Sequence, residues 1–195
     1  MRMLAGIVSG AAALAGCASV EPIQQAPAAG FFEALSAHCG KAYAGRAVAD
    51  DGGDGGWDGE RLVMHLADCT DDVIRIPLSV GEDRSRTWVV SRVGDDRLEL
   101  KHDHRHEDGS PDAVTMYGGT SVTDGTAARQ SFPVDAQSVA LFEAEGLSAS
   151  TVNVWAMEIG AETFAYELRR PTGRYFRAEF DLTEPVPAPP PPWGG

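Results

Sequence analysis

The segment Val73-Ile-Arg-Ile-Pro-Leu-Ser-Val80 alternates a strongly apolar set of residues with a mixed set. The apolar set consists of Ile74, Ile76, Leu78 and Val80. Successive side chains of a β-strand point to opposite faces of a sheet, so this period of two predicts a strand with one buried face. Pro77 belongs to the other set. Because proline cannot donate to a β-ladder, it indicates a sheet edge or a bulge.

The same period of two continues along most of the chain after Glu60. It predicts strands near 62–66, 73–80, 87–93, 97–106, 113–117, 128–132, 151–158, 163–168 and 175–182. Short junctions rich in Gly, Asp and Pro join several of them. We therefore expect a mainly β fold, an antiparallel up-and-down β-barrel of the lipocalin or calycin type. A two-sheet β-sandwich is the alternative.

Two helices are expected besides the strands. Four residues near the start of the domain recur at spacings of four, four and three: Phe31, Leu35, Cys39 and Ala42. This spacing predicts a short N-terminal helix that presents Cys39 to the core. A second helix is expected over about 136–145, before the last strands, because Asp135 is a suitable N-cap and Gly146 a suitable stop.

The ends of the chain differ in composition from its middle. Residues 17–30 are rich in Ala, Pro and Gln and predict a flexible tether, whereas 31–184 are expected to form a single β-barrel-like domain. Residues 185–195 predict a Pro-rich tail that either packs Trp193 onto the domain or docks into an aromatic groove of a partner. The Gly- and Asp-rich stretch 50–60 matches no calcium-binding pattern and is expected to be a solvated loop.

The first residues predict export. Arg2 precedes an uncharged apolar run that is too short for a transmembrane helix. The run ends in Leu14-Ala-Gly-Cys17, which resembles the lipobox of bacterial lipoproteins. The resemblance implies that 1–16 is a signal peptide and that Cys17 becomes the N-terminus, acylated with chains such as palmitate. Since Ala18 follows the cysteine, the resemblance also implies a cell-envelope location at the periplasmic face of the outer membrane.

Cys39 and Cys69 are the two cysteines left after Cys17. Thiols of exported proteins commonly pair, so we expect a Cys39–Cys69 disulfide that stabilises the fold by roughly 3–4 kcal/mol. The alternative is a pair of buried free cysteines. The spacing is unlike the paired C-x-x-C arrangement of structural zinc sites.

The chain is acidic, with 16 Lys and Arg against 29 Asp and Glu and a formal net charge of −13. Phosphate backbones would repel such a body, and no basic cluster offsets this, so nucleic acid is not an expected partner. No nucleophile elbow, P-loop or dinucleotide fingerprint follows the expected signal peptide. The sequence therefore favours a protein without catalytic activity, with a metalloenzyme as the alternative to be considered.

The stretch Arg97-Leu-Glu-Leu-Lys-His-Asp-His-Arg-His-Glu107 contains the candidate site. Its odd positions are all charged and are expected to face water, which turns His102, His104 and His106 inward. Adjacent residues on one face lie about 6.8 Å apart, so two neighbouring imidazoles can share zinc or another transition-metal ion with a residue from another strand. The alternatives are hydrogen bonds to Tyr, Asp or water at the mouth of the barrel, or direct contact with a ligand.

Several blocks of the chain together resemble an uncharacterised family of secreted bacterial proteins and lipoproteins. The blocks are Leu62-Val-Met-His-Leu66, Ile74-Arg-Ile-Pro-Leu78, Arg84-Ser-Arg-Thr-Trp88, Leu100-Lys-His-Asp-His-Arg-His-Glu-Asp-Gly109, Tyr117-Gly-Gly119 and Pro190-Pro-Pro-Trp-Gly194. The resemblance implies secretion. The family has no assigned activity, so the resemblance assigns no catalytic or binding residue to this chain.

Three functions fit these observations. In the first, a membrane-anchored envelope lipoprotein binds a small or amphipathic ligand in its barrel, with His102, His104 and His106 at the polar end. In the second, the same histidines bind a metal ion in a metal-binding protein or metalloenzyme. In the third, a non-catalytic envelope protein binds a partner through its acidic surface or its Pro-rich tail.

Overall fold

The computed structural model describes residues 26–51, 53, 56–94, 96–122 and 125–195. The expected signal peptide and the predicted lipidation site Cys17 lie outside these residues. In the part of the chain that is described, no helix combines the length and the apolar character needed to cross a membrane.

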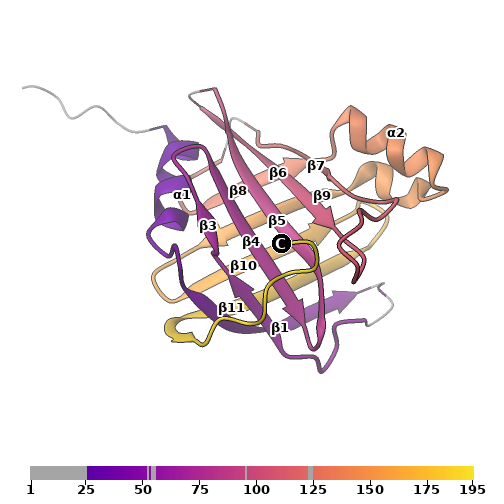
Figure 1. The fold of residues 1–195 in the computed structure, drawn as a ribbon. Helices are drawn as coiled ribbons and strands as arrows, with labels where there is room; N and C mark the ends of the chain where they lie inside the picture. The colour runs from indigo at the N-terminus through magenta and orange to yellow at the C-terminus, as the bar shows by residue number, and fades with distance from the viewer. Residues whose placement is uncertain (1–25, 52, 54–55, 95, 123–124) are drawn as a thin grey trace, which may run out of the picture.

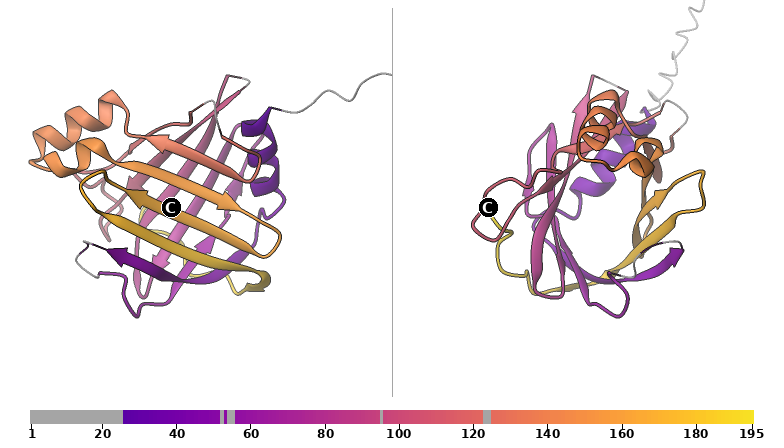
Figure 2. Two further views of the ribbon diagram at one scale, coloured as in Figure 1. Left: turned by 180° about the vertical axis from the view of Figure 1, so that it is seen from behind. Right: turned by 90° about the vertical axis from the view of Figure 1, so that its right-hand side faces the viewer.

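One antiparallel sheet curves around until it nearly closes into a barrel (Figures 1 and 2). Its continuous path contains β1 (Ala42–Asp51), β2 (Leu62–His65), β4 (Val73–Val80), β5 (Asp83–Val93), β6 (Arg97–His104), β7 (Tyr117–Thr120), β8 (Arg129–Pro133), β9 (Val154–Ile159), β10 (Thr163–Arg169) and β11 (Tyr175–Val186). The short strand β3 (Asp68–Cys69) pairs with β4 off this path. Apart from the pairing of β1 with β11, every pair on the path joins strands that follow one another along it in chain order, and β7 and β8 are its two ends. The expected antiparallel up-and-down barrel is confirmed.

The ends of the path, β7 and β8, approach each other beside α2 (Ala136–Ala144). The backbone N–H of Asp135 donates to the carbonyl of Gly118 at 3.0 Å, and Ser138 Oγ accepts the N–H of Gly118 at 2.8 Å. A Cβ atom on Gly119 would lie only 1.8 Å from the carbonyl oxygen of Pro133. Glycine at 119 is therefore what lets β7 lie this close to the segment that leads into α2.

The period of two in the sequence matches the register of the strands. Ile76 of β4 lies opposite Trp88 of β5, which lies opposite His102 of β6, and all three side chains are buried inside the barrel. Helix α1 (Pro27–Ser36) covers one end of the barrel, where it buries Phe31, Phe32 and Leu35 (Figure 1). The core therefore fills the barrel from the α1 end, and among the described residues loops, α2 and the 3₁₀ helix η1 (Ser148–Val152) lie at the opposite end (Figure 2).

The expectation for the N-terminal region is partly wrong. The helix begins at Pro27, inside the predicted tether, and ends at Ser36, so Cys39 and Ala42 are not helical. Gly40 has a φ angle of +77° in the turn that follows, a conformation that does not continue a right-handed helix. The chain then enters β1, a strand that the sequence pattern did not predict.

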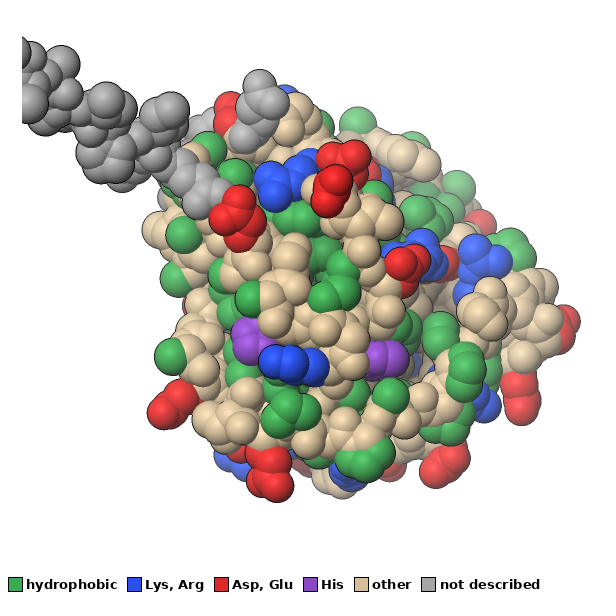
Figure 3. Space-filling view, turned by 60° about the vertical axis from the view of Figure 1, so that its left-hand side comes forward, with side chains coloured by type: hydrophobic (Ala, Val, Ile, Leu, Met, Phe, Trp, Pro, Cys, Tyr) green, Lys and Arg blue, Asp and Glu red, His purple; other side chains and the backbone are tan. Residues whose placement is uncertain are grey.

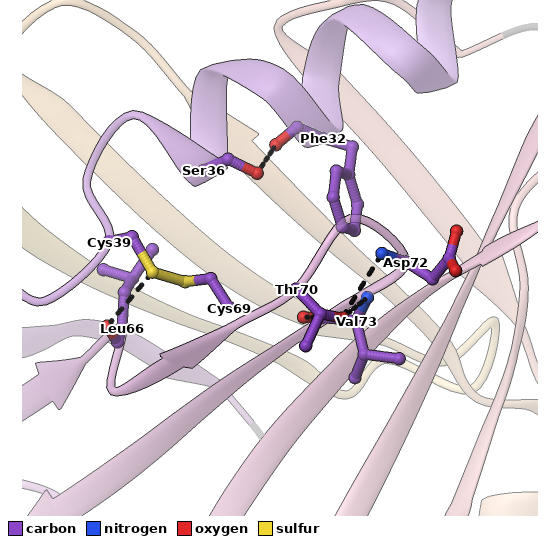
Figure 4. The surroundings of a disulfide bond; sticks show 8 residues. All are labelled: Phe32, Ser36, Cys39, Leu66, Cys69, Thr70, Asp72 and Val73. Carbon is purple, nitrogen blue, oxygen red and sulfur yellow. Dashed lines mark hydrogen bonds between the residues drawn. A yellow bond between two sulfur atoms is a disulfide. The ribbon is translucent and has the colours of Figure 1, made fainter.

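Cys39 and Cys69 form the expected disulfide, with their Cα atoms 6.3 Å apart (Figure 4). The bond joins the turn after α1 to β3, beside Leu66. It therefore closes a loop of 30 residues that contains β1 and β2.

Strand boundaries near the second helix differ from those expected. Asp135 caps α2 as predicted and accepts the N–H of Ser138 at 2.7 Å. The strand expected at 113–117 instead begins at Tyr117, because Met116 has a φ angle of +53° and breaks the extended backbone. The strand expected from 151 begins only at Val154, after η1.

Pro77 lies in the middle of the sheet and not at an edge, because β4 pairs with strands on both sides. It falls between the ladder that β2 forms up to Leu78 and the ladder that β3 forms from Arg75. The missing N–H of the proline thus faces a gap between two short partners.

The Pro-rich tail packs onto the barrel. It crosses the outer face near β4 and β5 (Figure 1), where Arg84 Nη1 donates to the carbonyl of Pro191 at 2.7 Å. The N–H of Trp193 donates to the carbonyl of Arg84 at 3.1 Å. The sequence left open whether the tail packs onto the domain or docks into a partner's groove, and in the structure it packs onto the domain.

Charged residues on the outer face of β8 to β11 form a network of ion pairs. Its centre is Glu167, only 3% exposed in its side chain, which accepts from Arg129 Nη2 at 2.7 Å and from Arg177 Nη1 at 2.5 Å. Glu158 pairs with the same two arginines. On the face drawn in Figure 3, side chains of both signs are likewise interspersed.

Candidate functional site

A cavity of about 250 Å³ is lined by residues of the barrel interior and by residues of α2 and η1. Seven aromatic residues contribute to its wall: Trp57, Trp88, Tyr117, Phe142, Trp155, Tyr166 and Phe176. They come from five strands, from α2 and from the loop that follows β1. An engineered cavity of about 150 Å³ holds benzene, so this cavity has room for a compact ligand of about two fused rings.

The rings of the wall present flat apolar surfaces. Trp88 and Tyr166 stack with their centroids 4.5 Å apart, and the indole of Trp57 meets Phe176 edge-on at 4.9 Å. Trp57 belongs to the stretch 50–60, which the sequence predicted as a solvated loop, so at this residue the prediction is wrong. The aromatic faces suit a flat apolar body better than a bulky or strongly polar one.

His102 is buried and both of its ring nitrogens are hydrogen-bonded. Nδ1 lies 3.1 Å from the carbonyl oxygen of Tyr117, which can only accept, so this nitrogen carries the proton. Nε2 lies 2.8 Å from the hydroxyl of Tyr166 and therefore accepts from it. Burial, with a smaller contribution from His104, lowers the pKa of His102 to about 3 and keeps the ring neutral.

His104 lies nearer the opening of the cavity. Its Nε2 is 3.2 Å from the hydroxyl of Tyr117, whereas Nδ1 has no hydrogen-bond partner among the residues that the structure describes. Burial, followed by the positive charge of Arg86, lowers the pKa of His104 to about 4. A neutral imidazole with one free nitrogen is thus available at the cavity wall.

His106 does not join the other two histidines. Strand β6 ends at His104, and the chain reverses through a bridge between Arg105 and Pro111, which leaves the His106 side chain exposed and away from the cavity. The prediction of three inward imidazoles is therefore wrong at His106, because the alternation ends with the strand.

The opposite face of β6 is also less exposed than expected. Lys101 and Asp103 are both buried. Lys101 Nζ lies 2.5 Å from Asp135, and Asp103 accepts from Arg75 Nη2 at 3.0 Å and Arg105 Nε at 2.9 Å. These charges tolerate burial because each has partners of opposite sign.

The described residues contain no cluster of three or more His, Cys, Asp and Glu side chains placed to bind a metal ion. His102 has both nitrogens engaged and His106 lies elsewhere, so the predicted site at His102, His104 and His106 is not assembled. His102 and His104 do line the cavity, as expected for a ligand site.

Three arginines also line the cavity, and the sequence reasoning missed all three: Arg86 of β5, and Arg170 and Arg174 of the turn between β10 and β11. Arg86 pairs with Asp83, and Arg174 pairs with Asp50. Their sequence neighbourhoods contain no signal of a shared site, because only the closure of the barrel brings 86 and 170–174 together.

Arg170 has neutral partners only. Its Nε donates to Asn153 Oδ1 at 2.6 Å and its Nη2 to Ser150 Oγ at 3.0 Å. No carboxylate within the described part of the chain pairs with it. Burial and the neighbouring Arg174 lower the pKa of Arg170, but an arginine stays charged at neutral pH. Among the described residues, Arg170 is therefore the one arginine of the cavity lining without a carboxylate partner.

The chain matches no protein-family model, and no curated protein sequence or solved structure matches it significantly. The resemblance to a family of secreted bacterial proteins and lipoproteins stays a prediction.

Proposed function

We propose that this protein binds a small amphipathic ligand inside its barrel. The observation that carries the proposal is the cavity itself, whose lining combines aromatic side chains with polar groups. Ligand sites commonly combine an apolar pocket with a few placed polar groups. Two of the three arginines of the lining are engaged in ion pairs, and Arg170 is the one without a carboxylate partner among the described residues.

The two other functions have less support. The metal-binding alternative requires a third ligand, and the described residues place none beside His102 and His104. Docking of the Pro-rich tail into a partner would compete with the hydrogen bonds to Arg84 that hold Pro191 and Trp193 against the barrel, although Pro191 itself is exposed.

The proposed binding protein works at the bacterial cell envelope. The support is the lipobox-like Leu14-Ala-Gly-Cys17, together with a disulfide that suits an oxidising compartment. Acylation at Cys17 would hold the barrel at the periplasmic face of the outer membrane, with the ligand cavity free to exchange its contents with the surrounding solution.

The binding proposal can be tested with a neutral probe of the right size and shape, 2-naphthamide, titrated by isothermal titration calorimetry. We expect binding with a dissociation constant at or below about 1 mM, as is usual for a fragment of this size. Trp57→Ala removes one wall of the cavity from a surface loop and should weaken binding several-fold. Val152→Ala, an exposed residue outside the cavity, serves as the matched control. Absence of binding by the unmodified protein of both 2-naphthamide and the corresponding carboxylate, 2-naphthoate, would overturn the proposal.

A further inference from the structure

We infer that the ligand is a small organic anion, a carboxylate on a flat apolar body, and that Arg170 binds its carboxylate. This inference rests on the proposed ligand-binding function and specifies the chemical class of the ligand. Its basis is the distribution of charge around the cavity.

The three arginines of the cavity differ in their partners. The charges of Arg86 and Arg174 are each balanced by a carboxylate, Asp83 and Asp50. Arg170 is held by an amide and a hydroxyl, which orient the guanidinium without neutralising it. An oriented and uncompensated guanidinium is the arrangement that binds a carboxylate with charge-assisted hydrogen bonds.

The acidic character of the chain makes the absence of a carboxylate partner for Arg170 unusual. With a formal net charge of −13, the molecule as a whole repels anions, and carboxylates to pair with Arg170 are abundant. The described structure nevertheless leaves this half-buried cation without one. A partly desolvated cation without a counterion is costly, and a bound anion would remove that cost.

The number of free charges favours a carboxylate over a phosphate. Arg170, the one arginine of the lining without a carboxylate partner among the described residues, matches a single negative charge. Asn153, Ser150 and His104 are neutral, and the carboxylate of Asp112, which acts on His104 from outside the lining, disfavours a second negative charge. A phosphate dianion would be undercompensated here. The aromatic wall, including the stacked pair Trp88 and Tyr166, supplies the flat surface for the body of the ligand.

The test compares two probes of nearly the same shape, 2-naphthoate and 2-naphthamide, which differ in charge. Both are titrated by calorimetry into the unmodified protein, into Arg170→Gln and into Arg169→Gln. Arg169 is the neighbouring residue, is more exposed and pairs with Glu167 on the outer face, so its replacement changes the net charge equally without changing the cavity.

We expect the unmodified protein to bind 2-naphthoate about tenfold more tightly than 2-naphthamide. Arg170→Gln should reduce this preference to within about twofold and leave the affinity for 2-naphthamide nearly unchanged. Arg169→Gln should retain the preference. In the unmodified protein, raising the salt from 20 mM to 500 mM should weaken the binding of 2-naphthoate but not of 2-naphthamide, a result that does not depend on the folding of any variant.

Equal binding of the two probes by the unmodified protein would overturn the inference and leave the proposed function standing. Failure of both probes to bind would overturn the proposed function itself. A preference for 2-naphthoate that survives in Arg170→Gln would show that another group binds the carboxylate, and would overturn the assignment of Arg170.

Discussion

The hydroxyl of Tyr166 donates to Nε2 of His102 at 2.8 Å and thereby joins β10 to β6 through the interior of the barrel. These two strands are not neighbours in the sheet, so the hydrogen bond links opposite sides of the barrel through its interior. Since the other nitrogen of His102 donates to a carbonyl, the Tyr166 hydroxyl supplies the hydrogen bond that this neutral ring still requires.

Replacing Tyr166 with Phe should lower the free energy of unfolding by roughly 1–3 kcal/mol, because it leaves Nε2 of His102 buried without a partner. Urea unfolding followed by circular dichroism measures the change. Tyr175→Phe, which removes a hydroxyl on the outer face of the barrel, provides a comparison. An unchanged free energy of unfolding in Tyr166→Phe would mean that the hydrogen bond between Tyr166 and His102 does not stabilise the fold.

The two cavity histidines should make the protein less stable as the pH falls from 6.5 to about 4.5. Their pKa values are lowered to about 3 and about 4 in the folded state, against 6.5 for an unperturbed histidine, so the unfolded chain binds more protons in this range. The stability that the two neutral rings contribute is fully present above pH 6.5. It decreases as the pH falls towards their folded-state pKa values. We expect a loss of roughly 4–5 kcal/mol between pH 6.5 and 4.5.

Urea unfolding at half-unit steps from pH 7.5 to 4.5 measures this slope. His104→Gln should reduce it, whereas replacement of the exposed His106 by Gln should leave it unchanged. His38 and His65, whose pKa values are also lowered by burial, add to the slope in the same direction. A stability that stays constant over this range would contradict the burial of His102 and His104 as neutral rings.

Glu167 should be the most important charge on the outer face. Glu167→Ala removes the buried carboxylate that Arg129 and Arg177 share and leaves them to share only the more exposed Glu158, and we expect a loss of about 3 kcal/mol in the free energy of unfolding. Glu184, an exposed residue of β11, offers a matched change, and Glu184→Ala should cost less than about 0.5 kcal/mol. Similar losses of stability in Glu167→Ala and Glu184→Ala would contradict the greater importance of the buried carboxylate.

The disulfide should stabilise the barrel by roughly 3–4 kcal/mol, because it closes the loop that contains β1 and β2. Unfolding of the protein with and without a reducing agent measures this value, and the double replacement of Cys39 and Cys69 by Ser should match the reduced protein. If reduction leaves the stability unchanged, the bond does not restrict the unfolded chain as expected.

Cys17 should decide where the protein is found in bacterial cells. Cys17→Ser should move it from the membrane fraction to the soluble fraction, or stop its processing. The mass of the wild-type protein isolated from cells should show the loss of residues 1–16 and the addition of acyl chains. A soluble, unacylated wild-type protein would contradict the lipobox interpretation.

The barrel was predictable because its central strands each bury one face completely. Ile74, Ile76 and Leu78 make the alternation visible in the sequence. Strand β1 was not predictable in this way. It alternates weakly and contains Gly45, whose lack of a side chain is required because a Cβ there would meet the carbonyl of Glu179 at 2.4 Å.

The candidate site was only half predictable. His102 and His104 could be placed inside because they continue the alternation begun by Leu98 and Leu100. Arg170 could not, because it lies beyond the end of β10, where the alternation no longer determines direction, and its partners Asn153 and Ser150 precede β9. Tertiary closure of the barrel brings these groups together.

The most direct measurement of the central claim is a crystal structure of the protein with saturating 2-naphthoate. We predict the naphthalene ring between the aromatic side chains of the cavity and the carboxylate within hydrogen-bond distance of Arg170. A cavity that contains only ordered water at saturating probe, or a probe bound elsewhere on the surface, would contradict the account.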